Sequence, residues 1–76
     1  MKEILAYLIG ALVQHSESVR IEEKRDGNRV TLELRVHPDD MGRVIGRQGR
    51  VAKSLRTVLQ AFAGRHGDRV RMDILE

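Results

Sequence analysis

The residues with the clearest chemical potential form a Gly-x-x-Gly turn, Gly46-Arg47-Gln48-Gly49, inside a basic stretch of the chain. Between residues 41 and 67 there are six basic residues and no acidic one. The basic residues are Arg43, Arg47, Arg50, Lys53, Arg56 and Arg65. Because glycine has no Cβ atom, such a turn lets the backbone come close to a ligand. A close backbone flanked by arginine suits the sugar–phosphate backbone of a nucleic acid.

The distribution of charge supports this interpretation better than the net charge does. The whole chain of 76 residues has a formal charge of only +3. Residues 41–67 carry a net +6, whereas the remainder holds eight basic and eleven acidic residues, a net −3. Positive charge gathered on one segment is what a polyanion-binding surface requires. The general alternative is a solvated helix face that is basic for solubility.

Other phosphate-binding motifs do not match. The nucleotide-binding P-loop needs a Lys followed by Ser or Thr after its last glycine, but Gly49 is followed by Arg50 and Val51. The dinucleotide fingerprint fails because Val44 occupies the place of its first glycine. Both nucleotide-binding readings are therefore excluded.

Catalytic and metal chemistry have little support in the sequence. The chain lacks cysteine, and its three serines have no recognisable base near them in sequence. His15, His37 and His66 are far apart and show no paired ligand spacing, so we expect surface or capping roles for them. The sequence predicts a non-enzyme with no metal site and no cofactor.

The first half of the chain predicts one helix and a hairpin. Apolar pairs that recur every four residues predict a helix over residues 2–14. Alternating apolar residues then predict strands over residues 19–22 and 30–36, with the turn Asp26-Gly27-Asn28 between them. Strands joined by such a turn form an antiparallel hairpin.

The second half predicts two helices and a last strand. Pro38 begins a short helix that ends at Gly46. A longer helix over residues 50–63 is expected to bury Val51, Leu55, Val58 and Phe62. Residues 70–74 alternate as a strand, which a two-helix crossover places parallel to the strand before it. The expected fold is α+β, in the order α-β-β-α-α-β, with a three-stranded mixed sheet covered on one face by three helices.

The turn, the basic helix after it and the order of elements together resemble the K-homology (KH) domain. The resemblance is to the type II arrangement, in which an extra helix and strand come before the core, and it covers residues 1–76 as a single domain. Among KH proteins the chain is most similar to the small single-domain bacterial RNA-binding proteins of the KhpA type. The resemblance implies that the Gly-x-x-Gly loop clamps about four nucleotides of single-stranded RNA.

The family pattern can be carried over to particular residues. The expected RNA-binding residues are Arg43, Val44, Ile45, Gly46, Arg47, Gln48, Gly49, Arg50 and Lys53. Ile45, Val51 and Leu55 are candidates for an apolar floor under the bases, with the core as the alternative and, for Leu55, the favoured role. Arg29 and the pair Lys24–Arg25 either close the other side of the groove or serve solubility, and the second is favoured.

The low aromatic content qualifies this expectation. Tyr7 and Phe62 are the only aromatic residues, and both lie on apolar helix faces that predict core positions. Without stacking platforms, one copy is expected to bind weakly and with little sequence specificity. The alternative function is a protein-interaction module that acts as a homodimer or as the partner of a KhpB-type KH protein, with Leu59 as a possible contact or core residue. No signal or membrane-spanning segment is visible, so a cytoplasmic location is expected.

Overall fold

The computed structural model describes all residues, Met1–Glu76. Its elements are α1 (Lys2–Gly10), β1 (Arg20–Asp26), β2 (Arg29–Arg35), α2 (Met41–Ile45), α3 (Arg50–Arg65) and β3 (Arg69–Leu75). Short 3-10 turns lie at Ser16–Ser18, Pro38–Asp40 and Arg47–Gly49. The order of helices and strands is the one that the sequence predicts.

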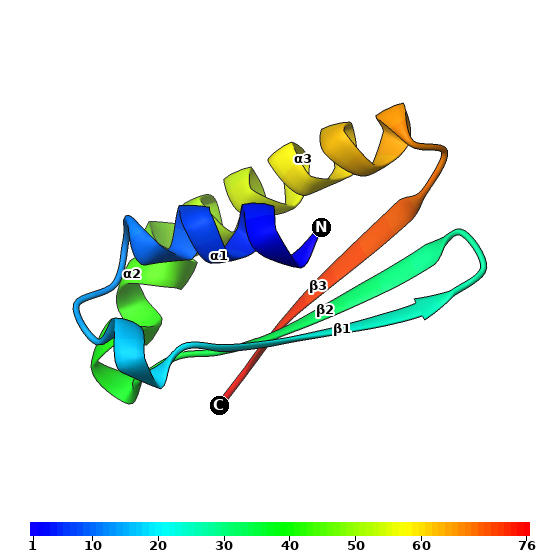
Figure 1. The fold of residues 1–76 in the computed structure, drawn as a ribbon. Helices are drawn as coiled ribbons and strands as arrows, with labels where there is room; N and C mark the ends of the chain where they lie inside the picture. Colours follow the sequence, from blue (N-terminus) through cyan, green and yellow to red (C-terminus); the bar gives the residue numbers. More distant parts are fainter.

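One mixed sheet forms the base of the molecule. Its strand order is β1-β2-β3, with β1 antiparallel to β2 and β3 parallel to β2. The crossover between the parallel strands is made by α2 and α3. All three helices lie on the same side of the sheet (Figure 1). The predicted α+β fold is confirmed.

The register of the strands decides which side chains meet the helices. Leu32 pairs with Met72, and Leu34 pairs with Ile21 on one side and Ile74 on the other. Side chains directly opposite one another share a face of the sheet, so this row points at the helices. The core they form is closed by apolar residues from all three helices: Leu5, Ile9, Val44, Leu55, Leu59 and Ala63.

The buried face of α3 differs from the prediction. The buried residues are Ala52, Leu55, Leu59 and Ala63. Val58, predicted to be core, is 48% exposed. Val51 and Phe62, also predicted to be core, are only half-buried. The two alanines complete the buried stripe, although their side chains are small. Periodicity alone gave more weight to the larger residues.

The N-terminal part also differs in detail. Helix α1 ends at Gly10 rather than at residue 14, and β1 is longer than predicted, running from Arg20 to Asp26. Tyr7 was predicted to be core but is 80% exposed. Two residues along a helix correspond to about 200°, so Tyr7 lies opposite the buried Leu5. The apolar stripe of α1 is narrower than its sequence indicates.

Candidate nucleic-acid interface

The Gly-x-x-Gly turn has a backbone that favours glycine at both ends. Gly46 has φ 78° and ψ 171°, a region that essentially only glycine adopts. Gly49 is left-handed, with φ 74° and ψ 15°. Gln48 between them is the only non-glycine residue with a positive φ, at 57°. The N–H of Gly49 donates to the carbonyl of Gly46 (3.1 Å), which closes the turn.

The two glycines face different surroundings. A Cβ atom on Gly46 would lie 2.4 Å from Cγ2 and 2.8 Å from the backbone nitrogen of Val51. The same atom on Gly49 would meet nothing within 4 Å. Gly46 is therefore required by packing inside the protein, whereas Gly49 leaves open space outside it. That open side is where a ligand can approach the backbone.

Most of the predicted site residues are accessible. The exposed ones are Arg43, Ile45, Arg47, Gln48, Arg50 and Lys53, and both glycines are half-buried. Val44 is the exception, because its side chain is fully buried and belongs to the core. The expectation that Val44 contacts RNA is therefore wrong for its side chain. Leu55 is also core, as favoured, with 6% of its surface exposed.

The first turn of α3 lies directly behind the loop. Gly49 is the residue before its first turn, and no side chain caps the exposed N–H groups there. The first turn also has no acidic residue. A helix of 16 residues presents partial positive charge at this end, and no side-chain cap or acidic residue of the first turn offsets it. Arg50 adds a full charge, while its Nη2 atom lies 3.5 Å from Oε1 of Gln48.

A separate cleft lies farther along α3, where its lining begins at Arg56. It lies between α3 and the free edge of β3 and has a volume of about 330 Å³. Nε of Arg56 donates to the carbonyl of Met72 (3.2 Å), and Nε2 of Gln60 donates to the carbonyl of Val70. Arg56 is seven residues beyond Gly49, which corresponds to about 10 Å along the helix. Arg56 belongs to the basic stretch of the sequence, but no pattern in the sequence indicates this cleft.

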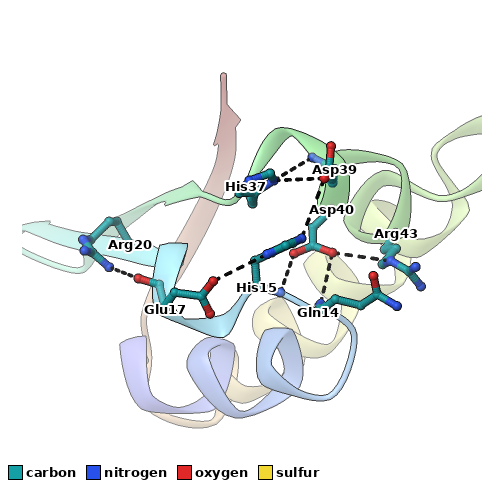
Figure 2. Close-up of polar contacts among 8 residues, drawn as sticks. All are labelled: Gln14, His15, Glu17, Arg20, His37, Asp39, Asp40 and Arg43. Carbon is teal, nitrogen blue, oxygen red and sulfur yellow. Dashed lines mark hydrogen bonds and ion pairs between the residues drawn. The ribbon is translucent and has the colours of Figure 1, made fainter.

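Asp40 fixes the base of the short helix α2. Its side chain is fully buried and accepts hydrogen bonds from the backbone N–H groups of Gln14 (3.0 Å) and His15 (2.9 Å) (Figure 2). Nε of Arg43 lies 3.4 Å from the same carboxylate. Burial alone raises the pKa of Asp40, but these donors and the charges of His15 and Arg43 hold the pKa below its usual value. The carboxylate thus joins the α1–β1 loop to the helix that leads into Gly46.

Two of the three histidines are not isolated, contrary to the prediction. The rings of His15 and His37 stack with centroids 4.0 Å apart. His37 does have the predicted capping role, because its Nδ1 accepts the backbone N–H of Asp39 (3.0 Å). His66 follows the end of α3 and lies against Phe62. The stack is a tertiary contact between distant segments, so no spacing in the sequence could indicate it.

The basic residues of the hairpin are engaged elsewhere. Lys24 pairs with Glu33 (3.2 Å), and Arg25 pairs with Asp68 through two hydrogen bonds of 3.1 Å. The partner raises the pKa of Arg25 and lowers that of Asp68. These pairs stabilise the hairpin end of the sheet, so the favoured non-binding role of Lys24 and Arg25 fits their contacts.

The fold and the loop together define a type II KH domain. A family model described as "KhpA/KhpB, KH domain" matches residues 2–74. An RNA-binding protein KhpA of Halalkalibacterium halodurans is 50% identical over the full length of both chains. Proteins of the same name from Chlamydia pneumoniae and Aquifex aeolicus are 43% and 42% identical, over all of this chain and 97% and 96% of theirs. The chain belongs to the KhpA/KhpB family of KH-domain proteins.

Two negative findings complete this description. A search among solved structures gave no match. None of the helices combines the length and the apolar character that a membrane-spanning segment requires. The assignment to the family therefore depends on sequence similarity over the whole chain, together with the order of elements and the conformation of the loop.

Proposed function

We propose that this protein binds single-stranded RNA without catalysing a reaction, and that the Gly46–Gly49 loop clamps the sugar–phosphate backbone. The observation that carries the proposal is the junction of loop and helix. There, exposed Arg47 and Gln48 project beside the uncapped N-terminus of α3, with no acidic residue in its first turn. Anions bind readily at such a helix end.

The proposed contacts follow from what is accessible. A phosphate approaches the open side of Gly49, and Arg47, Arg50 and Lys53 supply the surrounding charge. Ile45, which is 37% exposed, offers apolar surface next to the loop. The strand then runs along α3 toward Arg56 and the cleft beside β3. One domain of this kind holds about four nucleotides.

The relatives support RNA as the ligand, since they are named RNA-binding protein KhpA. No residue of the proposed clamp by itself distinguishes RNA from single-stranded DNA, because the contacts are to phosphates. We extend the proposal to a cytoplasmic protein that acts as an RNA chaperone or post-transcriptional regulator, consistent with a ligand-binding loop and no catalytic constellation.

The clamp is tested with Arg47→Asp combined with Gln48→Asp, two exposed positions. The probe is a single-stranded RNA of about eight nucleotides, twice the footprint of one KH domain. The double variant should lose affinity about tenfold or more at low salt. Each lost phosphate contact should also flatten the log–log salt dependence by about 0.7. Fluorescence anisotropy over a series of salt concentrations measures both quantities.

A matched variant controls for charge alone. Arg69→Asp combined with Ala61→Asp changes the net charge by the same amount at exposed positions near the far end of α3. It should weaken binding much less and leave the salt slope nearly unchanged. If the loop variant is folded and binds RNA with the same affinity and slope as this control, the clamp is in the wrong place. A parallel series with DNA of the same sequence measures the preference for RNA.

A second function, association with another KH domain, is favoured by one surface. A groove between α1 and α3 is lined by six apolar residues and one polar residue, Ser54. The apolar residues are Leu8, Ala11, Leu12, Val51, Leu55 and Val58. The exposed Tyr7 lies beside it, one helical turn from Ala11 in the groove wall. We propose this surface as the contact in a homodimer or in a heterodimer with a KhpB-type protein, which would join two weak RNA sites. Leu59 cannot serve there because it is fully buried.

This second proposal is tested by sedimentation velocity over a wide range of concentration. Tyr7→Ser combined with Val58→Thr should shift the protein toward the monomer without unfolding it, because both residues are largely exposed. The matched control is Ala61→Ser, on an exposed part of α3 outside the groove. A wild-type protein that stays monomeric at high concentration would remove the homodimer and leave only the heterodimer to test.

A further inference from the structure

We propose that His15, His37 and Asp39 form a binding site for one divalent transition-metal ion of the Zn²⁺ class. The three side chains come from the α1–β1 loop and from the junction between β2 and α2 (Figure 2). One ligand atom from each lies within 4.8 Å of the other two. The cluster is separate from the Gly46–Gly49 loop and has no part in the proposed RNA contacts.

The distances are close to what such an ion requires. Oδ2 of Asp39 lies 3.7 Å from Nε2 of His15 and 3.7 Å from Nδ1 of His37. In a tetrahedral site with bonds of about 2.0–2.1 Å, neighbouring ligand atoms are about 3.3–3.4 Å apart. A contraction of a few tenths of an ångström brings the carboxylate oxygen to this separation from each nitrogen. The two ring nitrogens lie within 4.8 Å of each other, and their separation is set by how the rings are turned. Asp39 is exposed, so water can supply a fourth ligand.

The orientation of the rings is the part that must change. Their planes are only 19° apart and their centroids are 4.0 Å apart, so the lone pairs, which lie in the ring planes, cannot both point at one ion. Both side chains are about one-third exposed, at 35% and 34%, which leaves room for each ring to turn. Rotation about the bond to a histidine ring has a broad energy profile, so the adjustment is inexpensive.

Binding also exchanges one hydrogen bond. In the metal-free protein, Nδ1 of His37 accepts the N–H of Asp39 at 3.0 Å. A neutral imidazole has one lone pair for either a hydrogen bond or a metal. The ion therefore replaces this bond, and the exposed N–H of Asp39 turns to water. The turn keeps its second closing bond, from the N–H of Asp40 to the carbonyl of His37 (2.8 Å).

The chemistry of the ligands selects the class of ion. Two imidazoles and one carboxylate suit Zn²⁺, Co²⁺, Ni²⁺ and Cu²⁺ better than Mg²⁺ or Ca²⁺, which prefer oxygen ligands. Oε1 of Glu17 lies 3.5 Å from Nδ1 of His15, the nitrogen that faces away from Asp39. A carboxylate on the outer nitrogen of a ligating histidine fixes its tautomer and increases its basicity. The hydrogen bond from the backbone N–H of His15 to Oδ2 of Asp40 (2.9 Å) holds His15 in place beside this site.

The experiment uses tag-free protein freed of metal with a chelator and then titrated with Zn²⁺. Two-dimensional ¹H–¹⁵N NMR should show saturable changes with one ion per chain, confined to residues 14–18 and 36–41. Loss of the Asp39 N–H hydrogen bond should move that amide signal most. Zn²⁺ at about ten times its dissociation constant should raise Tm by about 5–10 °C. Co²⁺ should give visible absorption bands typical of a low-coordinate site.

The variants assign the ligands. His15→Gln should abolish the saturable changes, and so should His37→Asn, in which Asn still supplies a capping acceptor for the N–H of Asp39. His66→Gln is the matched control, because it removes an imidazole from the distant end of α3, and it should bind as the wild type does. Changes that persist in His15→Gln, disappear in His66→Gln or fail to saturate in the wild type overturn the proposal. His15→Gln keeps the backbone bond to Asp40, so its fold provides a valid test even if His37→Asn is unstable.

Discussion

At the scale of single residues, the two glycines of the loop differ in what they permit. Gly46→Ala places a methyl group 2.4 Å from Val51 in a backbone region that essentially only glycine adopts. We expect a loss of about 3 kcal/mol of folding free energy. Gly49→Ala meets no neighbour and carries only the cost of a left-handed residue, about 1 kcal/mol. Urea unfolding of the two variants measures the difference.

The same pair separates stability from binding. In Gly49→Ala, the new methyl group occupies the open space from which a phosphate is proposed to approach. We therefore expect this variant to remain folded at room temperature and to bind the RNA probe at least about tenfold more weakly, a loss of about 1.4 kcal/mol. Anisotropy measured on protein shown to be folded by circular dichroism is the test. Unchanged affinity in Gly49→Ala would show that the backbone does not approach the ligand at this residue.

At the scale of the elements, α3 contributes buried residues to the core and also forms part of the proposed site. Leu59→Ala should cost about 3 kcal/mol, because Leu59 is fully buried between the helix layer and the sheet. Val58→Ala, one residue away and 48% exposed, should cost less than about 1 kcal/mol. Chemical unfolding of the two variants compares them directly. Equal losses would mean that the rotation of α3 differs from the one described.

The rotation of α3 also shows where sequence analysis works and where it does not. The sequence predicted every helix and strand in order. Apolar residues recur about every four positions in the helices and every two in the strands, and Pro38 and Gly46 mark the two ends of the short helix. The sequence did not predict which face of α3 is buried, since Leu55 fits either of two stripes. Only close packing reveals that Ala52 and Ala63 complete the buried one.

The candidate site, too, could be predicted only in part, because tertiary packing is not visible in the local sequence. Gly46, Gly49 and the arginines of the proposed site could be selected from sequence because local conformation and charge are visible there. The role of Asp40 could not be, because its partners Gln14 and His15 offer backbone N–H groups, which every residue possesses. Val44 was included because it lies next to the Gly-x-x-Gly turn in the sequence. Its side chain is fully buried, and burial depends on tertiary packing that the sequence motif does not show.

At the scale of the whole molecule, two carboxylates join distant parts of the chain. Asp40 joins segments 26 residues apart near the base of α2, and Asp68 pairs with Arg25, 43 residues away, beside the hairpin. The hydrogen bonds from Arg25 lower the pKa of Asp68, and the surrounding donors outweigh burial to lower that of Asp40. Both contributions depend on the charged form, so one solution condition tests both.

Low pH is the condition that tests the contributions of Asp40 and Asp68 together. A folded-state pKa below the unfolded value of about 3.9 gives a contribution that is complete above the unfolded pKa and is lost as the pH falls from there through the folded-state pKa. We expect Tm to fall between pH 6 and pH 3, as both carboxylates take up protons on unfolding. Repulsion among the basic residues also increases in acid, so a control variant is needed to interpret how stability depends on pH. Asp68→Asn should reduce the pH dependence of the urea midpoint, whereas Asp26→Asn, an exposed charge of the same sign, should leave it nearly unchanged. Identical slopes for the two variants would mean that the Arg25–Asp68 pair does not contribute to stability.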